Sequence, residues 1–368
     1  MKKKIDEFFI EEHFHGNKRK EEKQERKLIQ KKDRSKYKKT DLKKIKEISV
    51  SKKDLFQGRI ISISGENSII ASGGKEYVCS IRGFLKKERT QQKNILAVGD
   101  LVLFSSEGPN TGSISEVEKR YSILSRQDSL RNQIQIIAVN IDQVLITASV
   151  MMPPLKSPLI DRYIIAAIRG NMQPVVVINK IDLLEDKSYP KHAIEEEKKK
   201  LEELTKVYKE INIAFVLVSS KTKQGLSELF EMMKNKSSVF SGQSGSGKSS
   251  LINAILGTSL KTSDVVEKTY KGAHTTTKAS LIPLKDGGFC IDTPGIKSFG
   301  IWDLKKEEIK NYFSEFDKWA KKCKYPNCLH TIEPSCAVIE AVKKNKISSL
   351  RYDSYLNLIN NVDHNINR

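Results

Sequence analysis

Short runs of alternating apolar and polar residues fill the chain from about Leu55 to Ser125. A Gly73-Gly74 pair between two of these runs provides the residues of a tight turn. The candidate strands are residues 58–63, 67–72, 76–81 and 101–104. About five short strands separated by turn residues predict a small β-barrel of the OB type, although other small barrels would give the same pattern.

The pattern changes from about Ile134 onward, where longer apolar runs alternate with helical stretches. The apolar runs are residues 144–150, 174–178, 213–218 and 238–240. Near-continuous Val/Ile runs are typical of a parallel sheet that is covered on both faces. Residues 193–210 form a charged helical stretch between two of the runs, and the chain turns helical beyond about Gly300. This alternation predicts an α/β layout of the kind that binds nucleotides.

Charge separates the first part of the chain from the rest. Residues 1 to about 50 are rich in lysine and poor in large apolar side chains, so we expect a disordered extension that folds, if at all, on a partner. The whole chain of 368 residues carries 65 Lys and Arg against 45 Asp and Glu, a formal net charge of +20. Such a surplus attracts polyanions, and nucleic acid is favoured over an anionic membrane because no basic amphipathic helix with an aromatic face stands out.

The sequence shows no apolar run near the roughly 20 residues that a membrane-spanning helix needs. The basic start of the chain lacks the apolar stretch of a secretory signal. We therefore expect a cytoplasmic protein without a membrane partner, and we expect a monomer.

A phosphate-binding loop of the form G-x-x-x-x-G-K-S lies between a predicted strand and a predicted helix. Its residues are Gly242, Gln243, Ser244, Gly245, Ser246, Gly247, Lys248 and Ser249. In this context Lys248 would contact the β- and γ-phosphates and Ser249 would ligate Mg²⁺, while backbone N–H groups surround the phosphates. The loop does not distinguish ATP from GTP.

Two motifs upstream of this loop indicate guanine. Asn179, Lys180 and Asp182 form N-K-x-D at the end of a predicted buried strand. The Asp182 carboxylate would accept hydrogen bonds from guanine N1–H and the exocyclic amine, a pair of donors that adenine does not offer. Ser219 and Ser220 follow the next strand and correspond to a supporting S-A-K element, with serine in place of alanine.

The remaining motifs lie downstream. Asp292 and Gly295 belong to a D-x-P-G sequence at a strand end, where they would hold Mg²⁺ through water and contact the γ-phosphate. Among the three threonines at 275–277 we expect Thr276 to ligate Mg²⁺. The motif order is therefore permuted, because ordinary GTPases place the phosphate loop first. Ile296 occupies the position of the water-orienting glutamine, so His274 is the candidate catalytic residue, or else a simple loop histidine.

Three cysteines and a histidine cluster near the C-terminus. They are Cys323, Cys328, His330 and Cys336. A Cys₃His set is a closed structural zinc site in type, although these spacings are not those of a zinc finger. The alternative is three reduced cysteines with no metal.

Taken together, these motifs resemble the ribosome small subunit-dependent GTPases of the RsgA/YjeQ type. The likeness covers roughly residues 55–340 and rests on the permuted order, the loop from Gly242 to Ser250, the 274–277 and 292–295 segments and the Cys/His set. It implies an OB domain, a circularly permuted GTPase domain, a zinc module, GTP and Mg²⁺ as ligands, and a catalytic role for His274. Family members usually carry arginine before that histidine, whereas this chain has Ala273.

The resulting fold class is a multidomain α/β protein. The expected parts are a basic extension at 1–50, an OB-like barrel at 51–125, a permuted GTPase domain at 126–300 and a helical zinc-binding domain at 301–368. The resemblance implies that the chain hydrolyses GTP, binds the small ribosomal subunit and its rRNA, and assists late maturation of that subunit. The alternatives are an RNA-binding assembly scaffold with little turnover and a permuted GTPase that acts on another ribosomal RNA.

Overall fold

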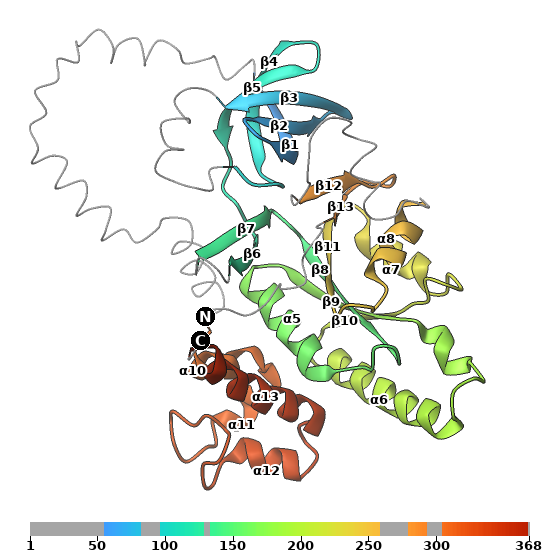
Figure 1. Ribbon diagram of the computed structural model, residues 1–368. Coiled ribbons are helices and arrows are strands. Elements are labelled where there is room, and N and C mark those ends of the chain that lie inside the picture. Colours follow the sequence, from blue (N-terminus) through green and yellow to red (C-terminus); the bar gives the residue numbers. More distant parts are fainter. Residues whose placement is uncertain (1–54, 82–95, 129–132, 258–278, 293–303, 367–368) are drawn as a thin grey trace, which may run out of the picture.

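The computed structural model of the chain describes residues 55–81, 96–128, 133–257, 279–292 and 304–366. Figure 1 shows a small barrel, a central sheet with its helices and a helical module following one another along the molecule. The basic N-terminal extension lies outside the described residues, so its expected disorder stays a prediction. In the described part of the chain, no helix has the length and apolar character that crossing a membrane requires.

Five strands close into the predicted barrel, in the order β1-β2-β3-β5-β4. They are β1 (Phe56–Ser64), β2 (Asn67–Ser72), β3 (Lys75–Ile81), β4 (Leu101–Gly108) and β5 (Thr111–Val117). Neighbouring strands are antiparallel except β3 and β5, which pair in parallel. Alternate residues point inward, and Ile60, Ile70 and Phe104 fill the interior completely buried.

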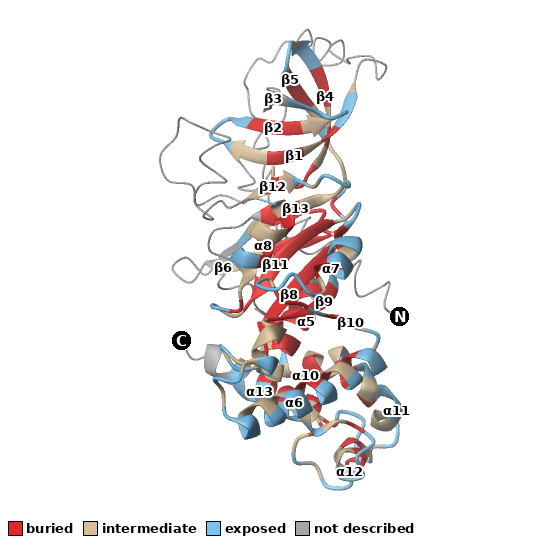
Figure 2. Ribbon diagram, turned by 90° about the vertical axis from the view of Figure 1, so that its right-hand side faces the viewer, coloured by how far each residue is buried: buried red, intermediate tan, exposed pale blue. Residues whose placement is uncertain are grey.

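The central sheet has six strands in the order β10-β9-β8-β11-β13-β12. The strands are β8 (Gln143–Ser149), β9 (Gln173–Asn179), β10 (Ala214–Leu217), β11 (Ser237–Gly242), β12 (Ser280–Pro283) and β13 (Phe289–Asp292). All pairs are parallel except β12 with β13. The four predicted apolar runs are confirmed as strands, and β8 and β11 are buried along their whole length (Figure 2).

Helices cover both faces of this sheet, which is why its strands are apolar on both sides. The helices are α5 (Ser157–Arg169), α6 (Lys191–Glu210), α7 (Leu226–Met233) and α8 (Lys248–Leu256). The apolar faces of α5 and α6 share a core with Val144 and Ile146 of β8. On the other face of the sheet, the apolar faces of α7 and α8 pack with Leu145 of β8, the residue between Val144 and Ile146.

A hairpin and a helical module complete the described chain. The hairpin of β6 (Ile123–Asp128) and β7 (Gln133–Val139) follows the barrel and was not predicted from the sequence. The module contains α10 (Lys306–Ile309), η3 (Lys310–Tyr312), η4 (Ser314–Phe316), α11 (Asp317–Ala320), α12 (Ala337–Lys343) and α13 (Ser349–Ile366). Its core includes Phe313, Phe316 and Tyr355, together with Ile165 from α5 of the sheet layer.

The barrel contacts the central sheet at the amino ends of two of the sheet's strands, β11 and β13. Arg59 of β1 hydrogen-bonds to Ser237 Oγ, and its guanidinium lies over the Phe289 ring, 5.2 Å from the centroid. Ser237 and Phe289 are the first residues of β11 and β13 and pair in register. The phosphate-loop and D-x-P-G segments leave from the carboxyl ends of β11 and β13. The barrel is therefore joined to the opposite, amino ends of the same two strands.

Candidate nucleotide site and metal centre

Four motif-bearing segments leave the sheet at the carboxyl ends of parallel strands. N-K-x-D follows β9, the serine pair follows β10, the phosphate loop follows β11, and D-x-P-G begins at the end of β13. In open α/β sheets ligands bind outside this edge. The three loops whose residues are described lie close enough to exchange hydrogen bonds, so these separated motifs form one site.

The phosphate loop is bent sharply at both ends. Gly242, the last residue of β11, has a φ of 134°, and a Cβ there would lie 2.0 Å from the Thr147 carbonyl oxygen. Lys248 begins α8, and its Nζ donates to the carbonyl oxygens of Gly242 at 2.9 Å and Gln243 at 2.7 Å. The ammonium is therefore held inside the curve of the loop. Partial burial lowers the pKa of Lys248, a cost that phosphate charge would offset.

The exposed part of the loop is available to a ligand. Ser244, Gly245 and the first-turn residues Ser249 and Ser250 are exposed. Ser249 and Ser250 stand at the N-terminus of α8, where unpaired N–H groups and the helix dipole favour negative charge.

Asn179 connects three of the loops through one side chain. Its Nδ2 donates to the Ser246 carbonyl at 3.0 Å, and its Oδ1 accepts from the Ser220 N–H at 3.1 Å. The side chain is completely buried, so these bonds have no competition from water. Gly247 has a φ of 92°, and a Cβ there would come within 2.2 Å of Asn179 Nδ2. The glycine is required both by the backbone angle and by the close approach of the asparagine.

Lys180 adds a second bridge between the guanine motif and the phosphate loop. It adopts a left-handed conformation with φ 65°, and its Nζ donates to the Gly245 carbonyl at 2.7 Å and to the Met152 carbonyl. The stem of the side chain is thereby laid along the loop, where it can cover a purine ring. Met152 belongs to the 150–156 segment between β8 and α5, which sequence reasoning did not assign to the site. The sequence could have predicted this segment as part of the site, because it directly follows the apolar run of a parallel strand.

Asp182 lies in η2 (Ile181–Glu185), directly after the left-handed Lys180. Ser219 Oγ donates to Asp182 Oδ1 at 2.6 Å and accepts from the Thr222 N–H at 3.1 Å. Ser219 is buried and Asp182 is partly exposed, so the serine orients a carboxylate that remains accessible. The hydrogen bond joins the two predicted guanine motifs, and their role toward a bound base stays a prediction.

The switch residues cannot be placed in the same way. Asp292 is the last residue of β13, beside β11, and only its backbone is described. His274, Thr276 and Gly295 lie outside the described residues, as do Ala273 and Ile296. Their predicted roles stay predictions.

The four predicted metal ligands come together in the helical module. The ligand atoms of Cys323, Cys328, His330 and Cys336 all lie within 4.8 Å of one another. The Sγ atoms of Cys323 and Cys336 are 3.8 Å apart, and His330 Nδ1 lies 3.6 Å and 3.4 Å from them. A tetrahedral zinc ion with bonds of about 2.3 Å to sulfur and about 2.1 Å to nitrogen requires separations of about 3.6–3.8 Å. The separations among Cys323, His330 and Cys336 therefore match those of a zinc site, and Cys328 lies within 4.8 Å of them as the fourth candidate ligand.

The surroundings of the cluster fit the same ion. Burial raises the pKa of the Cys328 and Cys336 thiols, so thiolates there require a neighbouring cation. Burial also lowers the pKa of His330, which favours the neutral imidazole that binds metal. Glu333 holds the ligand loop by accepting from the N–H groups of Leu329 at 2.6 Å, Thr331 at 2.8 Å and Ile332 at 3.1 Å.

A parallel sheet with a phosphate loop on β11 and a guanine motif on the earlier strand β9 defines a circularly permuted P-loop GTPase. Comparison with known proteins agrees. A family model described as RsgA GTPase matches residues 117–302. The chain therefore belongs to the RsgA GTPase family, whose members hydrolyse GTP, and the resemblance seen in the sequence is confirmed.

Relatives with curated names extend this likeness over most of the chain. The "Small ribosomal subunit biogenesis GTPase RsgA" of Chlorobaculum parvum is 36% identical, over 84% of this chain and 99% of that protein. The protein of the same name from Flavobacterium psychrophilum is 39% identical, over 77% of this chain and 86% of its own length.

Two solved structures share the fold. YjeQ from Thermotoga maritima has a TM-score of 0.68 at 31% identity, and the alignment covers 83% of this chain and 98% of the YjeQ chain. YloQ, described as a circularly permuted GTPase, has a TM-score of 0.66 at 26% identity, and the alignment covers 84% of this chain and 96% of the YloQ chain.

Proposed function

We propose that this GTPase binds the small ribosomal subunit and its rRNA, assists late maturation of that subunit, and hydrolyses GTP faster when bound to it. The observation that carries the proposal is the pair of hydrogen bonds at Asn179. The side chain donates to Ser246 in the phosphate loop and accepts from the Ser220 N–H in the loop after β10, so it joins the guanine motif to both. A scaffold with a vestigial site would not need this assembled geometry. The printed names of the relatives favour the small subunit over another RNA target.

In the proposed complex the guanine ring lies against the stem of Lys180, and Asp182 accepts from guanine N1–H and the exocyclic amine. The bonds from Ser219 to Asp182 and from Ser220 to Asn179 support this recognition. Lys248 releases the carbonyls of Gly242 and Gln243 and contacts the β- and γ-phosphates. The backbone N–H groups of residues 243–249 surround the phosphates.

Magnesium binding and hydrolysis depend on the switch segments. We assign Ser249 and Thr276 as Mg²⁺ ligands, Asp292 as a ligand through water, and Gly295 as a γ-phosphate contact. The Mg²⁺ would neutralise charge that develops on the transferred phosphoryl group. His274 orients the attacking water, because the hydrophobic Ile296 has no polar group for this purpose. Intrinsic turnover is then slow, and the bound subunit accelerates it by holding His274 against the attacking water.

The metal centre has a structural role in this proposal. Zn²⁺ bound by Cys323, Cys328, His330 and Cys336 leaves no coordination position for substrate. The net charge of +20 suits contact with rRNA, and a cytoplasmic monomer is the working form that we propose.

Co-sedimentation with isolated ribosomal subunits tests the partner. The chain loaded with a non-hydrolysable GTP analogue should sediment with small subunits in larger amounts than the chain with GDP, and it should not sediment with large subunits. The Lys248→Ala variant should lose the nucleotide dependence, whereas an exposed-lysine control, Lys234→Ala, should keep it. Equal sedimentation with both subunits would remove the proposed specificity.

A further inference from the structure

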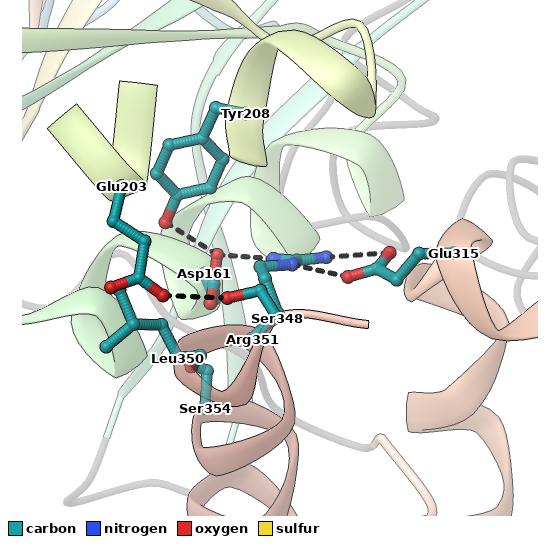
Figure 3. A network of polar contacts seen from close by, with 8 residues as sticks. All are labelled: Asp161, Glu203, Tyr208, Glu315, Ser348, Leu350, Arg351 and Ser354. Atoms are coloured by element: carbon teal, nitrogen blue, oxygen red, sulfur yellow. Dashed lines mark hydrogen bonds and ion pairs between the residues drawn. The ribbon is translucent and has the colours of Figure 1, made fainter. Parts of the chain in front are cut away.

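Arg351 of α13 is a buried cation between the helical module and the sheet layer. Its side chain is 3% exposed, and the Asp161 side chain that it contacts is 0% exposed. The guanidinium bonds to Asp161 Oδ1 through one nitrogen and to Glu315 through Nε at 2.6 Å (Figure 3). The aromatic ring of Phe313 lies 4.3 Å from the guanidinium carbon. One side chain therefore joins the two layers through a fully buried carboxylate, Asp161, and a second carboxylate, Glu315, that is 16% exposed.

On the sheet side, Arg351 reaches two helices that begin beside the guanine site. Asp161 is in the second turn of α5, and its Oδ1 also accepts a hydrogen bond of 2.8 Å from the Tyr208 hydroxyl of α6. The 150–156 segment runs into α5, and its Met152 carbonyl accepts from Lys180. The N-K-x-D loop and η2 lead into α6. A shift of either loop on nucleotide binding would therefore act on the helix that carries an anchor of Arg351.

On the module side, the helix of Arg351 holds the metal-ligand loop. The hydroxyl of Tyr352, the next residue, donates to the His330 carbonyl at 2.8 Å, and Tyr355 donates to the Leu329 carbonyl. Glu315, the second partner of Arg351, lies in η4, between the core aromatics Phe313 and Phe316. The contacts thus run without a break from the loops at the guanine site to the loop that carries His330.

We propose that Arg351 is a positioning residue that couples the guanine-nucleotide site to the metal-binding module. It fixes α5 and α6 against α13, so that a shift of the 150–156 and 179–182 loops on nucleotide binding is passed to the ligand loop at 328–331. This coupling goes beyond the proposed function, because it is a property of the isolated chain. By linkage, the module then alters nucleotide affinity by the same factor.

A merely structural ion pair would not behave in this way. Buried ion pairs contribute little net stability relative to apolar substitutes of similar volume, but breaking one by removing a single partner is costly. A neutral triple variant, Asp161→Asn with Glu315→Gln and Arg351→Met, removes all three charges together and is expected to fold. Arg351→Lys keeps the charge and loses the fork that bonds to both carboxylates.

Amide hydrogen exchange in the purified full-length chain, with and without saturating GDP, measures the coupling directly. The reporters are the N–H groups of Leu329 and Thr331, which bond to Glu333. In the unchanged protein GDP should slow their exchange by about fivefold or more, the lower end of common coupling factors. In the triple variant and in Arg351→Lys the GDP effect should disappear, while GDP still protects the phosphate loop.

Lys234→Met is the matched control, because it removes an exposed ion pair with Glu231 at the end of α7, which packs on the other face of the sheet, and it should leave the GDP effect intact. No effect of GDP on the reporters in the unchanged protein would overturn the proposal. Full retention of the effect in either variant of the network would also overturn it. Because no ribosomal subunit is present, these outcomes are independent of whether the proposed partner is correct.

Discussion

Asn179 shows how much of the nucleotide site depends on single side chains. Its two amide atoms bond to the phosphate loop and to the loop after β10, and the side chain is buried. An unpaired buried amide costs about 1–3 kcal/mol, so the three loops are favoured in one arrangement before any ligand binds. The guanine selectivity of the site then depends on Asp182 being held in that arrangement by Ser219.

Gly247→Ala tests this arrangement with one methyl group. The added Cβ would lie 2.2 Å from Asn179 Nδ2 and displace the buried amide. Loss of its hydrogen bonds should weaken GDP binding by about tenfold or more, measured with a fluorescent nucleotide. Gly257→Ala is the control, because Gly257 also has a positive φ of 62° but nothing lies within 4 Å of its added Cβ. Equal GDP affinity in the two variants would contradict the assigned contact.

Asp182→Asn tests base recognition. The carboxylate offers two acceptors to guanine, whereas an asparagine presents one acceptor and one donor, which matches xanthine. We expect GTP affinity to fall by about 100-fold and xanthosine triphosphate to bind better than GTP in the variant, measured by competition. A variant that still prefers GTP would show that another residue reads the base.

At the scale of elements, strand order explains why a permuted sequence still builds a GTPase site. β9, β10, β11 and β13 are parallel and their carboxyl ends share one edge, whatever their order in the chain. The four apolar runs of the sequence identified β8, β9, β10 and β11, and the D-x-P-G motif marked the end of β13. The signal is clearest in β8 and β9, because burial on both faces leaves few polar positions there. Turn glycines and alternation likewise identified four of the five barrel strands, whereas β5 was not among the candidate strands.

Other elements left no comparable signal. β12 is four residues long at a sheet edge, and β6 mixes polar and apolar residues without clear alternation. The Gln-Ile-Gln-Ile alternation of β7 is brief and has no such strand beside it in the sequence. The bond from Lys180 to Met152 and the buried contacts of Arg351 join residues far apart in sequence, so only the fold reveals them. The motifs indicated which ligands the site would bind, whereas the hydrogen bonds and ion pairs that hold its loops and helices in place were visible only in the structure.

The ligand loop at 328–336 makes a prediction about pH. Because burial raises the pKa of the Cys328 and Cys336 thiols, they are protonated at neutral pH, and a metal must displace those protons. Zinc affinity should therefore fall as pH falls, by about tenfold per pH unit for each proton released, in competition with a chelator of known affinity. Cys336→Ser should lose zinc, whereas Cys79→Ala, which changes a buried thiol of the barrel, should keep it. Affinity that does not change with pH would contradict zinc binding by thiols.

For the whole molecule, the nucleotide sheet lies between two parts that contact it at different places. The barrel reaches the amino ends of β11 and β13 through Arg59, and the metal module reaches α5 and α6 through Arg351. Figure 1 shows the barrel and the module at opposite ends of the molecule. An RNA partner that touched both would act on the sheet from two sides, which is the route by which we propose that the small subunit stimulates GTP hydrolysis.

The most direct test of this account is the rate of GTP hydrolysis by the purified chain alone, with isolated small ribosomal subunits and with large subunits. We predict a low rate for the chain alone, a marked increase with small subunits and no increase with large subunits. Identical rates under the three conditions would contradict the proposed partner and leave a GTPase whose activator is a different molecule.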